Sequence, residues 1–171
     1  MGEIFSRRAA LTALSGGFAA LLTRGAAAQP LKADKVIVYK SKRELFLVRD
    51  GQAMQSFLIA LGEHPVGPKM KKGDGRTPEG FYRIDGRNAH SVYHLSLHLS
   101  YPNEADRISS EMEGMVAGGD IAIHGMPAEF GHTDPIGYYK DWTDGCVAVG
   151  NRAIEQIWAA VDIGTPVEIR A

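Results

Sequence analysis

Cys146 and His124 are the two residues of this sequence whose types and surroundings best suit chemistry. Cys146 is the one cysteine among 171 residues and follows Thr143-Asp144-Gly145, whereas His124 directly precedes Gly125. A thiol is a weak nucleophile until it loses its proton, which a neighbouring imidazole can accept or balance as an ion pair. The residues alone leave two interpretations open: a cysteine–histidine catalytic pair, or an inert buried thiol near a structural histidine.

Gly145 favours the catalytic interpretation, because a residue without a side chain leaves the sulfur of Cys146 open to a substrate carbonyl. Backbone N–H groups around Cys146 could then stabilise a developing oxyanion. His124 ends the short apolar segment 120–124, and Cys146 begins the apolar segment 146–149. If these segments are neighbouring strands, the imidazole and the thiol come within reach of each other.

Three further histidines, His90, His94 and His98, recur every four residues. On a helix they would share one face and could bind a metal ion. The segment around them alternates instead, with Tyr93 and three leucines on one face and His94, Ser96 and His98 on the other, which predicts a strand. We therefore expect no metal site here. A solvated strand face is favoured for His94 and Ser96 over a place in the substrate cleft.

The segment 62–80 carries four basic residues, Lys69, Lys71, Lys72 and Arg76. Its Gly73-Asp74-Gly75-Arg76 stretch superficially resembles a phosphate-binding loop but lacks the Lys-Ser/Thr end of that motif. We interpret the basic run as part of a solvated loop. Attraction to anionic peptides is the functional alternative.

The elements that would position these residues are mostly strands, since apolar alternation recurs between many glycines and prolines. Strands are expected over 35–40, 43–49, 52–61, 81–84, 91–100, 120–124, 146–149 and 165–170. Helices are expected over 103–116, with Asn103 as N-cap, and from a cap at Asn151 to about 161. The expected fold class is mainly β with two helices in a sandwich-like domain. The 21-residue stretch 125–145 is expected to form a loop that acts as a lid.

Residues 1–28 have the form of an export signal. Arg7-Arg8 precede a small apolar run, and Ala26-Ala27-Ala28 offers a signal-peptidase site. The paired arginines fit a twin-arginine signal, and a general secretory signal is the alternative. Cleavage would leave residues 29–171 as one domain without a stable membrane anchor, in the periplasm or cell envelope.

Composition restricts the function further. The formal net charge of −1 argues against a protein built to bind nucleic acid, which needs a basic surface. A single cysteine excludes an intramolecular disulfide and a multi-cysteine zinc site.

In order and context, these motifs resemble the L,D-transpeptidase (YkuD-type) catalytic domain. Its signature is His-Gly, a spacer, then Ser or Thr, any residue, Gly and Cys, which corresponds here to 124–125 and 143–146. The segments 77–82 and 164–167 resemble two further parts of the family pattern, and the likeness covers roughly residues 35–169. The resemblance implies that Cys146 is the acylated nucleophile and His124 the general base, later the general acid.

The resemblance also implies supporting roles for the residues around this pair. The Gly125 carbonyl would orient the imidazole, and the N–H groups of Cys146 and Gly145 would form an oxyanion hole. Thr143 would support the turn or contact substrate, and Asp144 is placed with the substrate-contacting residues.

Two features depart from the family pattern. The spacer is longer than in compact members and carries Tyr139 and Trp142, which we expect in an aromatic lid that contacts substrate. Ala148 stands where the family often has Arg or Asn, and this resembles the branch that contains murein amidases.

The activity implied by the resemblance is cysteine acyl transfer on peptidoglycan stem peptides, ending in a cross-link to an amine acceptor. A hydrolase of the same fold, which passes the acyl group to water, is the first alternative. A cell-wall-binding module without catalysis is the second. We expect a monomer that uses no metal or organic cofactor.

Overall fold

The computed structural model describes residues 31–127 and 140–171 of the chain. The predicted export signal and Tyr139 therefore lie outside the described residues. Neither helix within these two ranges has the length and hydropathy of a membrane-crossing segment.

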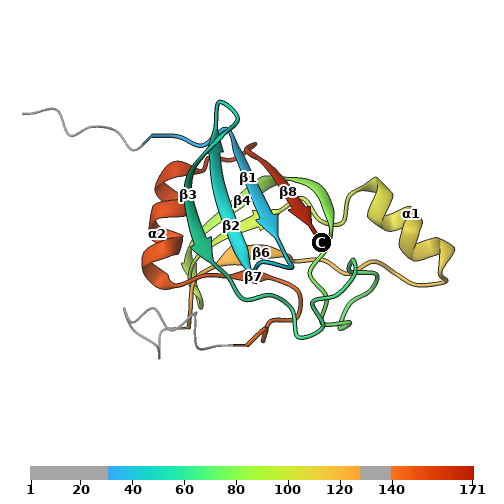
Figure 1. Cartoon of the computed structure of the whole chain (residues 1–171). Helices are drawn as coiled ribbons and strands as arrows, with labels where there is room; N and C mark the ends of the chain where they lie inside the picture. Colours follow the sequence, from blue (N-terminus) through green and yellow to red (C-terminus); the bar gives the residue numbers. More distant parts are fainter. Residues whose placement is uncertain (1–30, 128–139) are drawn as a thin grey trace, which may run out of the picture.

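Within the described residues, eight strands form one bent sheet in the order β3-β2-β1-β8-β4-β5-β6-β7 (Figure 1). The strands are β1 Lys35–Tyr39, β2 Glu44–Arg49, β3 Gln52–Leu58, β4 Gly80–Ser91, β5 His94–Leu99, β6 Ala122–His124, β7 Val147–Ala148 and β8 Pro166–Arg170. Two helices accompany them, α1 Glu104–Met112 and α2 Asn151–Ala160. The predicted fold class, mainly β with two helices, is confirmed.

Strand β4 connects the two halves of the sheet. Its first residues, Gly80 to Arg83, pair with β8, and its continuation from Ile84 to Ser91 pairs with β5. The chain after β3 then returns to the far end of the sheet, where Ala60 and Ala148 exchange two backbone hydrogen bonds of 2.9 Å each. This contact brings the two ends of the strand order together around one core, as in the expected sandwich-like arrangement.

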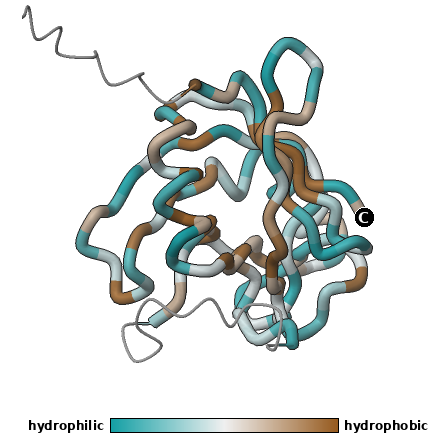
Figure 2. Tube along the Cα trace, turned by 60° about the vertical axis from the view of Figure 1, so that its left-hand side comes forward, coloured by the Kyte–Doolittle hydropathy of each residue, from teal (hydrophilic) through white to brown (hydrophobic). Residues whose placement is uncertain are grey.

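Alternating side chains fill this core, as the sequence pattern predicts. Hydrophobic positions concentrate along the inner strand segments in Figure 2, whereas hydrophilic ones follow the outer loops. Helix α2 covers one side of the sheet (Figure 1) and buries Ile154 and Ile157 completely. Burying such side chains stabilises a domain by roughly 1.5–3 kcal/mol each, so the core holds β5, β6 and α2 in fixed relation.

Several predicted element boundaries need correction. Segment 91–100 is not a single strand, because the chain turns at Val92-Tyr93 and Ser91 ends a β4 much longer than expected. Strand β3 ends at Leu58 rather than residue 61.

The helix starts and ends also differ in part from prediction. Asn103 does cap α1, where its side chain and that of Asp106 form a capping box. The helix ends at Met112 rather than 116, shortly before Gly114 at φ +69°. The N-cap of α2 is Gly150 rather than Asn151. Asn151 is instead a buried first residue of the helix, and its Oδ1 accepts the Met126 N–H at 2.7 Å.

Candidate active site

The strands β6 and β7 lie side by side, as the sequence predicted for the segments that end in His124 and begin with Cys146. They pair in parallel, with Ile123 opposite Val147 and His124 opposite Ala148. Cys146 directly precedes β7, so the same register places it beside Ala122. Its side chain therefore leaves the ladder on the face that carries His124, one diagonal step away.

The imidazole of His124 is buried and held in a defined orientation. The residue is 3% exposed, and Nδ1 lies 2.7 Å from the Gly125 carbonyl oxygen. Since a carbonyl oxygen can only accept, Nδ1 carries the proton and the lone pair of the neutral ring is on Nε2. Burial lowers the pKa of His124 from its ordinary value, against a smaller opposing effect of the Gly125 contact. The ring is thus a neutral base near pH 7.

Two aromatic side chains enclose the His124 ring. Tyr93 stacks on it with ring centroids 4.4 Å apart, and Trp142 meets it edge-on at 5.9 Å. The expectation that Tyr93 joins the leucine face of a strand is wrong, because Tyr93 lies in the β4–β5 turn. The alternation of the segment concealed this turn, so sequence reasoning missed Tyr93 as a neighbour of the site.

Trp142, predicted to contact substrate, lies beside the His124 ring. It packs against Ala60, Met126 and Ala148. Its Nε1–H is buried and has no hydrogen-bond partner within residues 31–127 and 140–171. A buried donor of this kind carries a desolvation cost until it finds an acceptor.

The thiol of Cys146 is half-buried and protonated in its resting form. Sγ donates to the Asp120 carbonyl oxygen at 3.6 Å. Burial raises the pKa of Cys146, and this outweighs the lowering effects of a backbone hydrogen bond at Ala122 and of the Lys69 charge. An imidazole can accept the proton of a thiol or balance a thiolate as an ion pair. The directions of both pKa shifts favour a neutral imidazole beside a protonated thiol over a preformed ion pair.

Thr143 fixes the turn that leads into Cys146. Its hydroxyl donates to the Cys146 carbonyl oxygen at 2.8 Å and accepts the Gly145 N–H at 3.1 Å. This geometry gives Thr143 the turn-supporting part of its expected role. It also gives the Gly145 N–H a partner within the turn, so the oxyanion role expected for this group is not available in this conformation.

Gly145 could not be another residue without rearrangement. Its φ of +126° lies in a region that side chains disfavour, and an added Cβ would lie 2.5 Å from the Arg76 carbonyl oxygen. The turn therefore packs tightly against the loop 62–80. The side chain of Asp144 is exposed and points to no partner in the hydrogen bonds of the described residues, whereas its carbonyl oxygen is engaged by this same loop.

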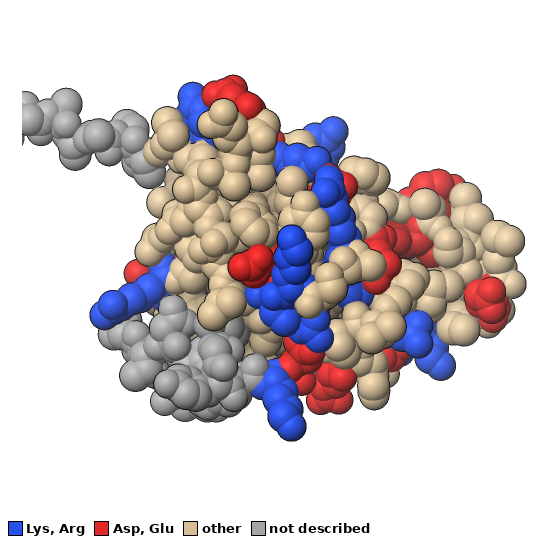
Figure 3. Space-filling view, in the orientation of Figure 1, with Lys and Arg blue, Asp and Glu red and all other residues tan. Residues whose placement is uncertain are grey.

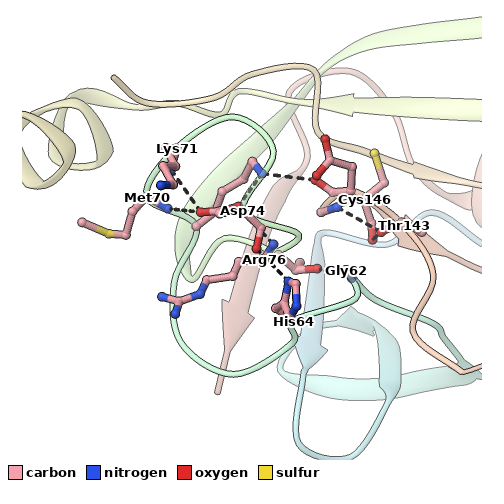
Figure 4. A network of polar contacts seen from close by, with 12 residues as sticks. Gly62, His64, Met70, Lys71, Asp74, Arg76, Thr143 and Cys146 are labelled. Atoms are coloured by element: carbon pink, nitrogen blue, oxygen red, sulfur yellow. Dashed lines mark hydrogen bonds and ion pairs between the residues drawn. The ribbon is translucent and has the colours of Figure 1, made fainter. Parts of the chain in front are cut away.

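That loop is only in part the solvated basic segment expected from its composition, since Lys71 and Lys72 are exposed but Lys69 is not. Lys69 is 3% exposed, and its Nζ donates to Asp74 Oδ1 at 2.8 Å and to the Asp144 carbonyl oxygen at 3.1 Å. Figure 4 shows Asp74 inside the loop, with Thr143 and Cys146 on the neighbouring turn. The composition of the segment could not predict this burial, because the ion pair between Lys69 and Asp74 depends on how the loop folds.

Asp74 organises the loop around its carboxylate. Besides Lys69, it accepts the backbone N–H groups of Met70, Lys71 and Arg76 at 2.8–3.0 Å. These donors lower the pKa of Asp74 to about 2, although burial acts in the opposite direction. A charged carboxylate with four donors makes this loop a preformed wall of the site.

A cavity of about 700 Å³ opens against this wall. Its lining includes Glu63, His64, Met70, Arg76 and Met115. Within the described ranges, the Arg76 guanidinium has neither an ion pair nor a hydrogen-bond partner, whereas its backbone contacts the turn at Gly145. Lys and Arg side chains gather along the middle of the face seen in Figure 3, with Asp and Glu side chains beside them.

The histidines considered as metal ligands are engaged otherwise. His94 pairs with Glu155 at 2.8 Å and His98 with Asp85 at 2.6 Å. Across the β5–β6 ladder, Ser96 is opposite His124 and thus lies on the same face. Among the residues that the structure describes, no group of three or more His, Cys, Asp or Glu side chains could hold a metal ion.

The family model of the L,D-transpeptidase catalytic domain (YkuD) matches residues 33–169, and the chain therefore belongs to this family. YafK of Escherichia coli (strain K12), provisionally named an L,D-transpeptidase, is 28% identical over 130 residues, which are 72% of this chain and 45% of YafK. The chain thus spans less than half the length of this curated relative.

Solved structures share the fold. The helical cell shape determining protein Pgp2 from Campylobacter jejuni superposes with a TM-score of 0.58 at 25% identity, over 80% of this chain and 46% of Pgp2. An L,D-transpeptidase from Mycobacterium smegmatis superposes with a TM-score of 0.53 at 13% identity, over 80% of this chain and 58% of that protein. The second likeness concerns the fold alone.

Proposed function

We propose that this chain is a cysteine-dependent L,D-transpeptidase that acts on peptidoglycan stem peptides in the cell envelope. Family membership supports the reaction class. The single observation that carries the proposal is the placement of Cys146 and His124 on one face of the β6–β7 pair, with Nδ1 of the imidazole bound to Gly125. That contact leaves Nε2 as the base.

In the acylation step, Nε2 of His124 takes the proton of Cys146 as Sγ attacks the carbonyl at the L-centre of meso-diaminopimelate. The carbonyl oxygen becomes an oxyanion, which the Cys146 N–H would stabilise. When the intermediate collapses, the imidazolium gives its proton to the leaving amine and terminal D-alanine departs. The product is a thioester between the tripeptide and Cys146.

In the transfer step, the side-chain amine of a second stem attacks the thioester. His124 takes a proton from this amine and returns it to the departing sulfur, so a new amide bond forms and the thiol is restored. Because Cys146 and His124 are both neutral at rest, we expect the thiol to lose its proton to His124 as Sγ attacks the substrate carbonyl. Burial of the imidazole supports this, since burial disfavours a charged ring before substrate binds.

The cavity beside the loop 62–80 gives the stem peptide a place to bind. Cys146 and His124 do not line this cavity, but Arg76 does, and its backbone contacts the turn at Gly145 directly before Cys146. We therefore expect an extended stem peptide to run from the thiol along the loop toward the cavity. The Arg76 guanidinium at this cavity has no partner among the described residues and is suited to a substrate carboxylate, which it can bind through two parallel hydrogen bonds. Carboxylates are abundant on stem peptides that contain diaminopimelate.

Hydrolysis by the same acyl-enzyme is a second candidate function, favoured by Ala148. This residue is completely buried and exchanges two backbone hydrogen bonds with Ala60. No side chain from this position can therefore bind an acceptor stem, and water could take its place. The wall-binding module without catalysis, the remaining alternative, would leave the Cys146–His124 arrangement without use.

Incubation with purified disaccharide-tetrapeptide, followed by mass spectrometry, tests the proposal. We expect a cross-linked dimer that is absent with Cys146→Ala, a variant that removes the sulfur and little volume. Tripeptide without dimer would establish the hydrolase and exclude the transpeptidase. Binding without either product would favour the wall-binding module. Residues 1–28 as an export signal stay a prediction, which N-terminal sequencing of the exported protein would test.

A further inference from the structure

A buried ammonium group lies beside the turn that carries Cys146, and the acyl-transfer steps do not use it. The side chain of Lys69 is 2% exposed, and its Nζ donates to the Asp144 carbonyl oxygen at 3.1 Å. A Cβ added to Gly145 would lie 3.3 Å from the same Nζ. Lys69 thus binds Asp144 and lies next to Gly145, the two residues that immediately precede Cys146.

The position of this ammonium is fixed from several directions. Asp74 holds Nζ at 2.8 Å and is itself held by three backbone N–H groups of the loop. The hydroxyl of Ser110 donates to the Met70 carbonyl oxygen at 2.7 Å, which anchors the loop to α1. A free lysine side chain samples many rotamers, whereas these contacts hold Lys69 in one. Its ammonium group therefore stays at the Asp144 carbonyl oxygen of the turn.

We propose that Lys69 is a positioning residue for Cys146: its ammonium, held by Asp74, binds the Asp144 carbonyl and keeps the turn and its thiol in place beside a fixed positive charge. A role of Lys69 in catalysis rests on the proposed function. The effect of Lys69 on the position and ionisation of the Cys146 thiol does not. Figure 4 shows the loop and the turn joined by this polar network.

Three charged groups act on the pKa of Cys146, and Lys69 is the positive one. Asp144 and Asp120 oppose ionisation of Cys146, Lys69 favours it, and His124 on β6 is held neutral by burial. Lys69 is therefore the group whose charge favours the thiolate. Removing that charge raises the pKa of Cys146 further, because the two carboxylates then act without opposition.

The chain offers a matched control in a second buried lysine. Lys40 is also 2% exposed and fixes the same loop, since its Nζ donates to the carbonyl oxygens of Gly67 and Thr77 and to Glu79. It has no contact with the turn 143–146 in these hydrogen bonds. Lys40→Met and Lys69→Met therefore each remove a buried ammonium group that binds the loop 62–80, but only the second removes the charge beside the thiol.

The experiment measures the rate of Cys146 alkylation by iodoacetamide as a function of pH. We expect Lys69→Met to move the profile to higher pH and to slow the reaction roughly three- to tenfold at a fixed pH below the thiol pKa. The Lys40→Met profile is expected to coincide with that of the unmodified chain. A Lys69→Met profile that also coincides, or an equal displacement by Lys40→Met, overturns the inference.

A double variant addresses loss of folding. Lys69→Met leaves Asp74 buried and unpaired, whereas Lys69→Met with Asp74→Asn removes both charges at nearly constant shape. We expect the double variant to keep the native circular dichroism spectrum and the displaced profile. A folded double variant with the original profile rejects the role of Lys69. Because alkylation needs no peptidoglycan, failure of the proposed reaction would leave this result intact, and the two failures are distinguishable.

Discussion

At the scale of single residues, the proposed reaction takes its pH range from His124 and Cys146. Burial lowers the pKa of His124 and raises the pKa of Cys146 from their ordinary values. The reactive form needs a neutral imidazole and a protonated thiol, so both shifts widen its range. We expect kcat/KM for tetrapeptide to be nearly constant from about pH 7 to pH 8.5. An acid limb centred above pH 7 would contradict the neutral pair.

Arg76 is the residue whose removal should affect substrate binding more than chemistry. We expect Arg76→Ala to raise KM for tetrapeptide roughly 10- to 100-fold with little change in kcat, as for loss of a charged hydrogen bond. Arg76→Lys keeps the charge without the planar fork and should lie between the two. If Arg76 binds a carboxylate, amidation of that group should weaken binding in the unmodified chain and not in Arg76→Ala. Equal effects of amidation in both would refute the assignment.

Among the secondary-structure elements, the sequence predicted the strands with strict alternation and the two segments that bring Cys146 and His124 together. Strands such as β1 and β2 can be predicted from their apolar runs alone, without knowledge of the tertiary structure. The sequence could not reveal Tyr93 or Lys69 as neighbours of the site. Tyr93 belongs to an alternating run that a positive φ of 69° at His94 interrupts, and Lys69 has the same local composition as the exposed Lys71 and Lys72.

Packing of α2 against the end of β6 depends on Gly125. A Cβ there would lie 2.6 Å from Asn151 Oδ1, 2.9 Å from Ile154 Cγ2 and 2.9 Å from the Tyr93 carbonyl oxygen. We expect Gly125→Ala to destabilise the fold by about 1–3 kcal/mol and to reduce activity, because the carbonyl that orients His124 must shift.

Gly119 provides the control for this substitution, since a Cβ at Gly119 meets nothing within 4 Å. Urea unfolding of Gly119→Ala should match that of the unmodified chain within about 0.5 kcal/mol. If Gly125→Ala unfolds at the same urea concentration as Gly119→Ala, α2 tolerates the added methyl group and the packing argument fails.

For the whole molecule, Asp74 links stability to acid. Its pKa is about 2 in the folded chain against an ordinary value of 3.8, so the folded state binds fewer protons. The resulting stabilisation, about 1–2 kcal/mol, is complete above pH 4 and is lost as the pH falls toward 2. Asp74→Asn lacks this contribution, so the difference in unfolding free energy between the two chains should shrink over that interval. A difference independent of pH would show that Asp74 is not protonated during acid unfolding.

The position of strand β8 in the sheet affects how the chain folds during synthesis. It lies between β1 and β4, in parallel with β1 and antiparallel to β4, and so joins the first strand of the domain to the rest through residues 166–170. During synthesis these residues follow every other strand of the described sheet. Until they emerge, β1, β2 and β3 lack their connection to the half of the sheet that carries β6 and β7. The core of the described sheet therefore cannot be completed before β8 has been made, and the Cys146 thiol reaches its final position only after that point.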